Sequence, residues 1–291
     1  MRLHSLLHGE VREFIQHWCR VSIPNFKPSR IAAERPYLDK RDECGPFDII
    51  GDVHGCLEEL KALLLELGYR PAQVRSEWTH PKGRKLIFAG DLSDRGPDTP
   101  GVIKMAMKIV RYGLGYAVMG NHDEKLLRYL LGNPVKVSGG LQKSIEQYEA
   151  LCEYDRLQAQ SLAKSFLEKL PPHIVFDGGG LVVAHAGLSA EFHGVDAPAA
   201  VHFALYGPVT TGEGPDGRPA ARDWASDYNG EAIVAQGHVP VDDVTAVNNV
   251  WMLDTGCAFG GKLSALRYPE LEVVSVPAAE VYWPRKGALA A

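Results

Sequence analysis

The sequence predicts an α/β fold with parallel strands. Three apolar segments with strand character are each followed by a glycine-containing polar turn and then by a segment with helical periodicity. These pairs are 46–50 with 57–67, 85–89 with 100–113, and 116–119 with 124–131. Alternation of this kind is typical of β-loop-α units, whose strands end at one edge of a sheet. Ligands of open α/β sheets bind in the crevice at that edge.

The first unit has the clearest signals. Its strand is the apolar run Pro46-Phe47-Asp48-Ile49-Ile50. Leucines then recur at helical spacing, at positions 57, 60, 63, 64 and 67. Gly68 is expected to end this helix, because glycine readily adopts the left-handed conformation that helix ends require.

The second and third units follow the same plan. After the strand at 85–89, we expect Thr99 to cap a helix that begins at Pro100 and closes at Gly113. The third strand, 116–119, leads directly into a polar turn, and a helix is expected to follow at 124–131. All three turns therefore lie at the carboxyl edge of the predicted sheet.

The rest of the chain predicts a helical cap and further strands. The segment 141–170 is too long for one ordinary helix, so we expect two, with their apolar residues in the core rather than in a substrate platform. Strands are expected at 181–184 and 233–235. The segment 206–230 is rich in glycine and proline and predicts a long loop, a type that is usually functional or disordered.

The first 46 residues are predicted to be an N-terminal extension of a single domain that spans 47–291. Apolar residues recur at helical spacing within 3–18, ahead of prolines at 24, 28 and 36. We expect this short amphipathic helix to pack on the core. A helix that binds a partner or a membrane surface is the alternative, although its polar face carries acids as well as bases.

Composition indicates a cytoplasmic protein. The formal net charge of -5 and the pI near 6.1 provide no general basic field, so no long nucleic-acid groove is expected. The 5 cysteines are scattered and include no CxxC pair, which favours a reducing compartment. Charged residues interrupt the N-terminal apolar stretch, and no run is long enough to cross a bilayer, so we expect neither a signal peptide nor membrane insertion.

Five short segments carry the candidate chemistry, because each places an oxygen or imidazole donor close to glycine. They are Gly51-Asp52-Val53-His54-Gly55, Gly90-Asp91-Leu92-Ser93-Asp94-Arg95-Gly96, Gly120-Asn121-His122-Asp123, His185-Ala186-Gly187 and Gly237-His238. Carboxylate, imidazole and amide donors suit divalent ions such as manganese, iron or zinc. No cysteine pair has the sequence spacing of metal ligands. The segments together predict a two-metal phosphoesterase.

The order of these segments closely resembles the calcineurin-like metallophosphoesterases, and specifically their phosphoprotein phosphatase branch, from about residue 47 to the C-terminus. The blocks 205–207, 210–213, 237–240, 254–257 and 260–270 resemble the phosphatase domain of bacterial polynucleotide kinase-phosphatase and the symmetrical dinucleoside tetraphosphate hydrolases. No kinase P-loop occurs, so a stand-alone phosphatase is expected. The resemblance implies a β-sandwich of two mixed sheets flanked by helices, in α/β/β/α layers.

The resemblance also implies a ligand set for two divalent metal ions. The proposed ligands are Asp52, His54, Asp91, Asn121, His185 and His238. Asp91 would bridge the ions, Asp52 and His54 would hold one, and the other three would hold the second, with the division of His54 and His238 left open. Two ions about 3.5–4 Å apart need such a bridge, and their shared water becomes hydroxide-like near neutral pH. Mn²⁺ is the expected metal, with Fe, Ni or Zn as alternatives.

Three further residues are implied to contact or activate the substrate. Arg95 would hold phosphate oxygens through its rigid fork of donors, beside Asn121. His122 would protonate the leaving alkoxide. Asp94 would orient the His122 imidazole and keep it cationic.

Two neighbouring positions carry more specific expectations. Ser93 stands where the family usually has valine, which predicts looser packing beneath the site. Asp254 either matches an acidic position of the narrower family or caps a strand end, and both alternatives stay open. The other histidines are expected to be structural: His4, His8, His17, His80, His173, His193 and His202.

The expected activity is hydrolysis of phosphomonoesters, and also of cyclic phosphodiesters, on nucleotides or nucleic-acid ends. The alternatives are a symmetrical bis(5'-nucleosyl)-tetraphosphatase, a serine/threonine protein phosphatase and a non-catalytic phosphate-binding module. Because the chain has no basic stripe, recognition is expected to reach little beyond the terminal phosphate, its sugar and one base. Arg95 and the 206–230 loop are expected to make these contacts.

Overall fold

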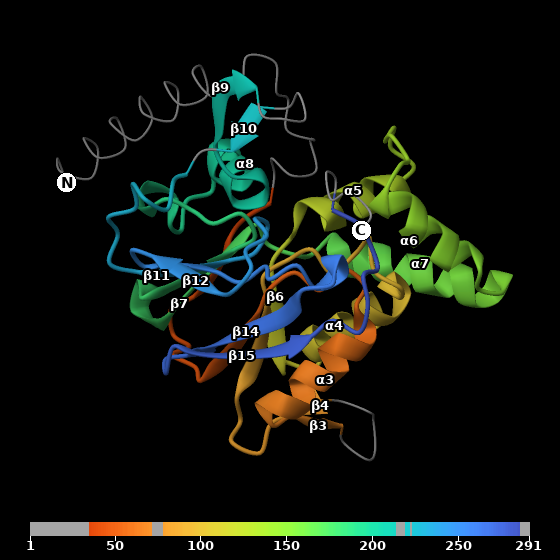
Figure 1. Ribbon diagram of the computed structural model, residues 1–291, viewed down its shortest axis with the longest axis horizontal. Coiled ribbons are helices and arrows are strands. Elements are labelled where there is room, and N and C mark those ends of the chain that lie inside the picture. The colour runs from red at the N-terminus through yellow and green to blue at the C-terminus, as the bar shows by residue number, and fades with distance from the viewer. Residues whose placement is uncertain (1–34, 72–77, 214–218, 222, 286–291) are drawn as a thin grey trace.

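Two β-sheets lie face to face at the centre of the molecule, with helices on their outer sides (Figure 1). This computed structural model describes residues 35–71, 78–213, 219–221 and 223–285. The helix expected within 3–18 lies outside the described residues. In Figure 1, α8 lies above one sheet, and α3 and α4 lie below the other. The α/β/β/α layering implied by the family resemblance is therefore confirmed.

The sheet next to α3 has the strand order β15-β14-β2-β5-β6. Strands β2 (Phe47–Ile50), β5 (Lys85–Phe88) and β6 (Gly115–Ala117) are parallel, as the alternating pattern predicted. Strand β14 (Lys262–Tyr268) runs antiparallel to β2, and β15 (Glu272–Pro277) runs antiparallel to β14. The sheet is thus mixed rather than purely parallel.

The second sheet has the order β1-β7-β8-β11-β13-β12. Its strands are β1 (Leu38–Lys40), β7 (His173–Phe176), β8 (Leu181–Ala184), β11 (Ile233–Gln236), β13 (Val250–Met252) and β12 (Thr245–Val247). Strands β8, β11 and β13 are parallel, whereas β7 and β12 are antiparallel to their neighbours β8 and β13. Strand β1 pairs with β7 from within the predicted N-terminal extension, so the sheet begins before the expected boundary at residue 46.

Alternating side chains divide the core into two regions. On β5, Leu86 and Phe88 belong to the larger core cluster with α3 and α4, whereas Ile87 belongs to a second cluster. Residues of the other sheet, including Leu181 and Val183 of β8, complete that second cluster and are fully buried. Because successive strand residues point to opposite faces, this division places the second cluster between the sheets.

The longer helices are α3 (Leu57–Leu67), α4 (Thr99–Arg111), α5 (Asn121–Leu130), α6 (Gly140–Glu149), α7 (Glu153–Leu167) and α8 (Pro198–Tyr206). The first three begin and end within three residues of the predicted positions, whereas α8 was not predicted. The α3 helix ends as predicted at Gly68, whose φ is 99°. The predicted cap of α4 is wrong: Asp98 accepts the Gly101 amide at 2.8 Å, while the Thr99 side chain is buried and turned toward Asp94.

The remaining predictions have mixed outcomes. Helices α6 and α7 confirm two helices in 141–170, and their buried residues join the core. The segment 206–230 is not one long loop, because β9 (Val209–Glu213) and β10 (Pro219–Ala221) form an antiparallel pair. Shorter elements are β3 (Arg70–Pro71), β4 (Trp78–Thr79), η1 (Asp177–Gly179), η2 (Ala190–Phe192) and η3 (Cys257–Phe259). Among the described residues, no helix combines the length and apolar character that a bilayer span requires.

Candidate active site

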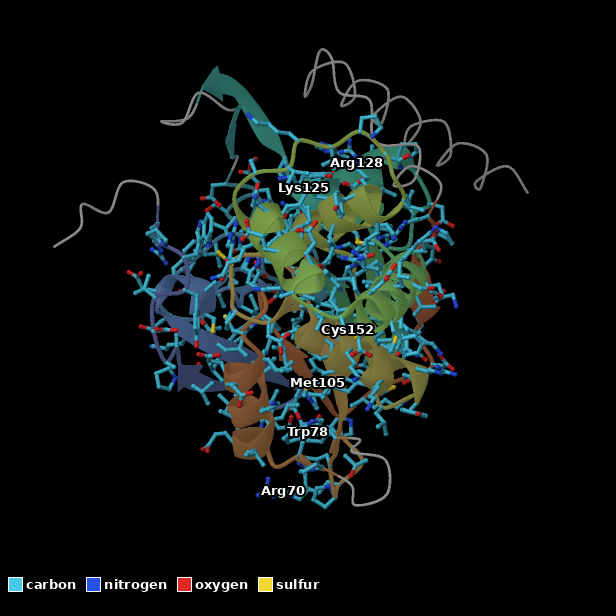
Figure 2. All side chains as sticks on the ribbon, turned by 90° about the vertical axis from the view of Figure 1, so that its right-hand side faces the viewer. Arg70, Trp78, Met105, Lys125, Arg128 and Cys152 are labelled. Carbon is cyan, nitrogen blue, oxygen red and sulfur yellow. The ribbon has the colours of Figure 1, made fainter. Side chains whose placement is uncertain are left out.

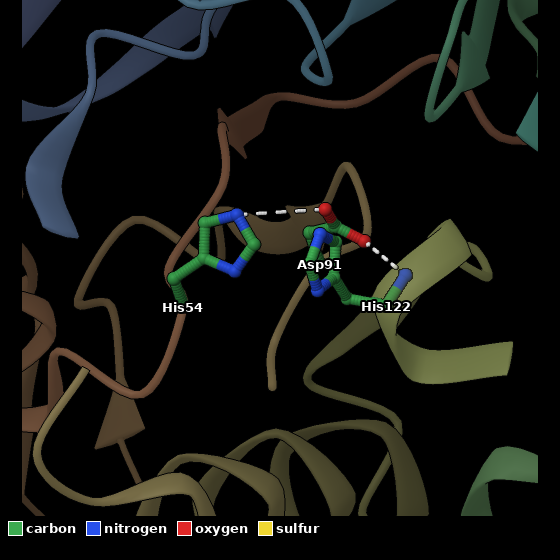
Figure 3. A group of neighbouring side chains, drawn as sticks. All are labelled: His54, Asp91 and His122. Carbon is green, nitrogen blue, oxygen red and sulfur yellow. Dashed lines mark hydrogen bonds and ion pairs between the residues drawn. The ribbon is translucent and has the colours of Figure 1, made fainter. Parts of the chain in front are cut away.

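The five predicted segments meet at one edge of the sandwich. The loops after β2 and β5, together with the start of α5 after β6, come from one sheet, and the loops after β8 and β11 come from the other. Hydrogen bonds and close contacts link all nine predicted site residues across these loops. Figure 3 shows three of them, with dashed lines that join Asp91 to the His54 ring and to the His122 amide at the start of α5.

One group of donors converges around Asn121. Its Oδ1 lies 2.8 Å from His185 Nε2 and 3.0 Å from His238 Nδ1, and these two nitrogens are 3.1 Å apart. Asp91 Oδ1 lies 3.4 Å from His185 Nε2. His185 Nδ1 lies 3.0 Å from the Ala89 carbonyl, so it carries the proton and leaves a lone pair on Nε2. A carboxylate, an amide oxygen and an imidazole lone pair that meet at one point are a donor set that fits a cation.

A second group of donors lies on the other side of Asp91. His54 Nε2 is 3.5 Å from Asp91 Oδ2 and 3.7 Å from Asp52 Oδ2. The Ser93 carbonyl lies 2.7 Å from His54 Nδ1 and fixes the tautomer that points a lone pair inward. Asp91 thus offers Oδ2 to this group and Oδ1 to the first, as a bridging carboxylate would.

Burial controls the charges of these groups. It lowers the pKa of His54, His185 and His238, the last to about 3, so the three imidazoles are neutral and able to act as metal ligands at neutral pH. Burial, together with the charges of Asp254 and Asp91, raises the pKa of Asp52 well above its usual range. Buried carboxylates at such close quarters are stabilised when cations lie among them.

Glycine is required beside two of the carboxylates because they lie against the backbone. A Cβ at Gly120 would lie 2.2 Å from Asp91 Oδ1, and one at Gly237 would lie 1.8 Å from Asp52 Oδ1. Such contacts are far inside van der Waals distance. The glycines of the sequence motifs therefore make room for the donors that follow or face them.

Backbone strain is concentrated in the same loops. His54, Asp91, Asp94, Arg95 and His238 have φ values of 46°, 48°, 75°, 65° and 71°. Residues other than glycine rarely adopt this left-handed region, and each such conformation costs on the order of 1–3 kcal/mol. The surrounding hydrogen bonds hold these loops in place, as strained residues at functional sites require.

The predicted proton donor lies beside the predicted phosphate ligand. His122 Nδ1 is 2.7 Å from Asp94 Oδ2, and Arg95 Nη2 is 2.9 Å from His122 Nε2. Arg95 Nη1 also contacts His54 Nε2, and the guanidinium lies 5.0 Å from the Phe259 ring centre. Because an arginine only donates, His122 Nε2 accepts here. Arg95 would therefore have to leave this contact before His122 Nε2 could carry a proton.

Asp123 has a supporting role that the sequence analysis missed. Its Oδ1 accepts hydrogen bonds from the Ser93 amide at 3.0 Å and the Ser93 hydroxyl at 2.9 Å, and its Oδ2 accepts from the Leu92 amide at 3.2 Å. Burial and the charge of Asp91 raise the pKa of Asp123 to about 7. The looser packing predicted for Ser93 is wrong, because its hydroxyl is buried and joins the β5 loop to α5.

Helix α6 also holds the loop after β5, through two residues that the sequence analysis did not single out. The Ser144 hydroxyl donates to Asp94 Oδ1 at 2.8 Å and accepts from the Asp94 amide at 3.1 Å. Gln147 accepts from the Thr99 amide at 2.8 Å and donates to the Gly96 carbonyl at 2.8 Å. These contacts fix the carboxylate that faces His122.

Two further clusters adjoin the site. Asp254 Oδ1 accepts the Gly256 amide at 2.9 Å, which confirms the strand-end cap, and Asp254 also raises the pKa of Asp52, so it lies against the candidate metal ligands. Cys56, Glu59 and Cys257 form a separate buried cluster, whose ligand atoms lie within 4.8 Å of one another. Sequence spacing gave no sign of this pairing.

Comparison with known families agrees with this geometry. The calcineurin-like phosphoesterase family matches residues 45–275. The chain belongs to this family. It is therefore a hydrolase of a family that depends on divalent metal ions, and the converging donors around Asp91 supply suitable ligands.

Curated relatives match this phosphoesterase along most of its length. Bis(5'-nucleosyl)-tetraphosphatase PrpE [asymmetrical] of Anoxybacillus flavithermus is 41% identical over 240 residues, which cover 82% of this chain and 97% of the relative. The protein of the same name from Bacillus subtilis is 43% identical and is covered to 96%. A crystal structure provisionally described as a diadenosine tetraphosphatase has a TM-score of 0.59 at 25% identity, covering 84% of this chain and 98% of its own.

Metal removal should abolish activity reversibly. After exhaustive chelation, we expect the purified phosphoesterase to lose hydrolysis of nitrophenyl phosphate. The candidate ligands are oxygen and imidazole donors that suit metal ions, and the bound ions would polarise the phosphate and activate the attacking water. Added manganese should restore it. Elemental analysis should accompany the rates, since full activity in a metal-free sample would refute a metal site.

Proposed function

We propose that this phosphoesterase hydrolyses dinucleoside tetraphosphates asymmetrically, to a nucleoside triphosphate and a nucleoside monophosphate. The observation that carries the proposal is the set of relatives named asymmetrical bis(5'-nucleosyl)-tetraphosphatase, which are 41% and 43% identical over nearly their whole length. This proposal replaces the activity first expected from the sequence. Nucleic-acid ends receive no support from these relatives. Asymmetric cleavage of the tetraphosphate replaces the symmetrical cleavage that was the first alternative.

The geometry supports a definite assignment of roles. Asn121, His185 and His238 would hold one divalent ion, Asp52 and His54 the other, and Asp91 both, since its two oxygens face the two groups. We infer Mn²⁺ as the metal. Two bound ions would supply Lewis-acid polarisation of the phosphate and a water of lowered pKa.

The remaining residues act on the substrate directly. Arg95 would exchange its contacts with the imidazoles of His54 and His122 for phosphate oxygens, which suit its planar fork of donors. Asn121, at the start of α5, would contact the same phosphate. The His122 imidazole, held by Asp94, would then donate a proton to the leaving oxygen.

We also infer a single catalytic domain that works in the cytoplasm. Residues from β1 at Leu38 to β15 contribute to the two packed sheets, and α6 reaches the site through Ser144. The four described cysteines are free thiols, which fits a reducing compartment. Helices α6 and α7 would then act as a cap that supports the catalytic loop.

Product analysis tests the proposal directly. Incubation with diadenosine tetraphosphate should yield ATP and AMP in equal amounts, whereas ADP as the main product would show symmetric cleavage. The kcat/KM for this substrate should exceed that for a phosphoserine peptide by at least about tenfold, or roughly 1.4 kcal/mol of transition-state binding.

The comparison should include a ribonucleoside 3′-phosphate, a 2′,3′-cyclic phosphate and a 3′-phosphorylated RNA. A preference for the peptide would contradict the nucleotide assignment. A preference for the RNA end would instead restore the activity first expected from the sequence.

A further inference from the structure

A groove with a cavity volume of about 660 Å³ leads away from the candidate metal centre along α5. We call it the α5 groove and define it by Asn121, Glu124, Lys125, Arg128, Lys136 and Tyr206. It begins at Asn121, whose Oδ1 lies among the candidate metal ligands. A ligand in the groove would therefore lie directly beside a phosphate held at the candidate metal site.

Helical geometry places cations at regular distances along the groove. Lys125 and Arg128 follow Asn121 by four and seven residues in α5, so all three share one face of the helix. At 1.5 Å per residue they lie roughly 6 Å and 10 Å along the axis from Asn121. Figure 2 shows Lys125 and Arg128 next to each other on this face.

The segment after α5 adds a third cation. Arg128 Nη2 donates to the Pro134 carbonyl at 2.9 Å and thereby holds this segment against the helix. Two residues further on, Lys136 lines the same cavity. The groove thus carries cations from both α5 and the segment that follows it.

The lining of the α5 groove carries three cations and one acid. Within the described part of the chain, Lys125, Arg128 and Lys136 make no ion pair with a carboxylate. The acid in the groove, Glu124, is buried and accepts a hydrogen bond from the Tyr206 hydroxyl at 3.2 Å. Three cations against one acid, on a chain with a net charge of -5, create a local positive field that favours an anion.

We propose that the α5 groove binds the phosphates of the substrate that lie beyond the scissile bond, with Lys125, Arg128 and Lys136 as specificity-determining residues. This inference rests on the proposed function. A substrate with several linked phosphates would contact these cations one after another, whereas the phosphate of a phosphomonoester would reach only the metal site. Cations one and two helical turns from Asn121 would also determine which phosphate lies at the metals, so that three phosphates leave together and cleavage is asymmetric.

The test removes two of the charges. Lys125→Gln/Arg128→Gln should lower the ratio of kcat/KM for diadenosine tetraphosphate to kcat/KM for nitrophenyl phosphate by at least tenfold, or about 1.4 kcal/mol, because charged hydrogen bonds to phosphate are lost. The ADP fraction of the products should rise as the register loosens. Lys104→Gln/Arg111→Gln is the matched control, since it removes two charges from exposed positions of α4. An unchanged ratio, or the same fall in the control, would overturn the proposal.

A second measurement does not depend on cleavage of the tetraphosphate. Tripolyphosphate and orthophosphate are used as inhibitors of nitrophenyl phosphate hydrolysis at a fixed concentration of free manganese. The Lys125→Gln/Arg128→Gln variant should weaken inhibition by tripolyphosphate at least fivefold more than inhibition by orthophosphate. If diadenosine tetraphosphate proves not to be a substrate, this result would still support the groove, and only the proposed function would fail. Equal weakening of both inhibitors would overturn the groove alone.

Discussion

Replacement of Asp91 by asparagine is expected to abolish both metal binding and turnover. Asp91 Oδ1 lies 3.4 Å from His185 Nε2 and Asp91 Oδ2 lies 3.5 Å from His54 Nε2, so both donor groups depend on this carboxylate. The amide keeps the shape but removes the negative charge and replaces one acceptor with a donor. Metal content by elemental analysis and kcat/KM on nitrophenyl phosphate should fall together to background.

A matched variant separates this effect from a general loss of charge. Glu66→Gln removes an exposed carboxylate of α3 and should leave metal content and rate unchanged. Circular dichroism should show that the Asp91→Asn chain remains folded. An Asp91→Asn protein that retains two metal ions per chain would refute the bridging role, whatever its rate.

Local sequence patterns predicted the elements that present the site. The strand and helix of the first unit, β2 and α3, were found because an apolar run, a leucine stripe and Gly68 all act within neighbouring residues. The candidate site residues could also be named, because each lies within two residues of a glycine in a segment that follows a strand, and because the order of these segments resembles the family's motifs. Such signals depend only on residues close in sequence, where backbone geometry dictates the pattern.

Elements without a local period escaped prediction. Helix α8 is buried on nearly all sides, from Ala199 to Leu205, so it shows no polar face to reveal its period. Strand β1 is short and partly exposed, and only its pairing with β7 makes it a strand. The β9–β10 pair was read as a loop because glycine and proline surround and interrupt it.

Local sequence patterns also could not predict the contacts that support the site. Ser144 reaches Asp94 across 50 residues, and Cys56, at the start of α3, meets Cys257 near the C-terminal strands. A serine in the middle of a helix has no sequence feature that distinguishes it from an exposed one. Only the packing of α6 against the β5 loop gives that hydroxyl its role.

His122→Ala is expected to leave the metals bound and to slow turnover selectively. His122 Nδ1 is held by Asp94 at 2.7 Å, and its Nε2 lies 2.9 Å from Arg95 Nη2, the proposed phosphate ligand. General acid catalysis contributes roughly 10²–10⁴-fold when the leaving group is a poor one, such as the sugar oxygen of a ribonucleoside 3′-phosphate. The loss should be much smaller with nitrophenyl phosphate, and similarly small with diadenosine tetraphosphate, whose leaving oxygen belongs to a phosphate and also needs little protonation.

Rates on the three substrates, measured beside metal content, decide between a proton donor and a metal ligand. Asp94→Asn should follow the same order of losses to a smaller extent, because it releases the imidazole without removing it. Loss of metal in His122→Ala would instead place His122 among the ligands of the ion near His54 and Asp91, with which it forms one cluster of donors. Equal slowing on all three substrates with full metal content would remove His122 from the proton-donor role, since only a proton donor makes the loss depend on the leaving group.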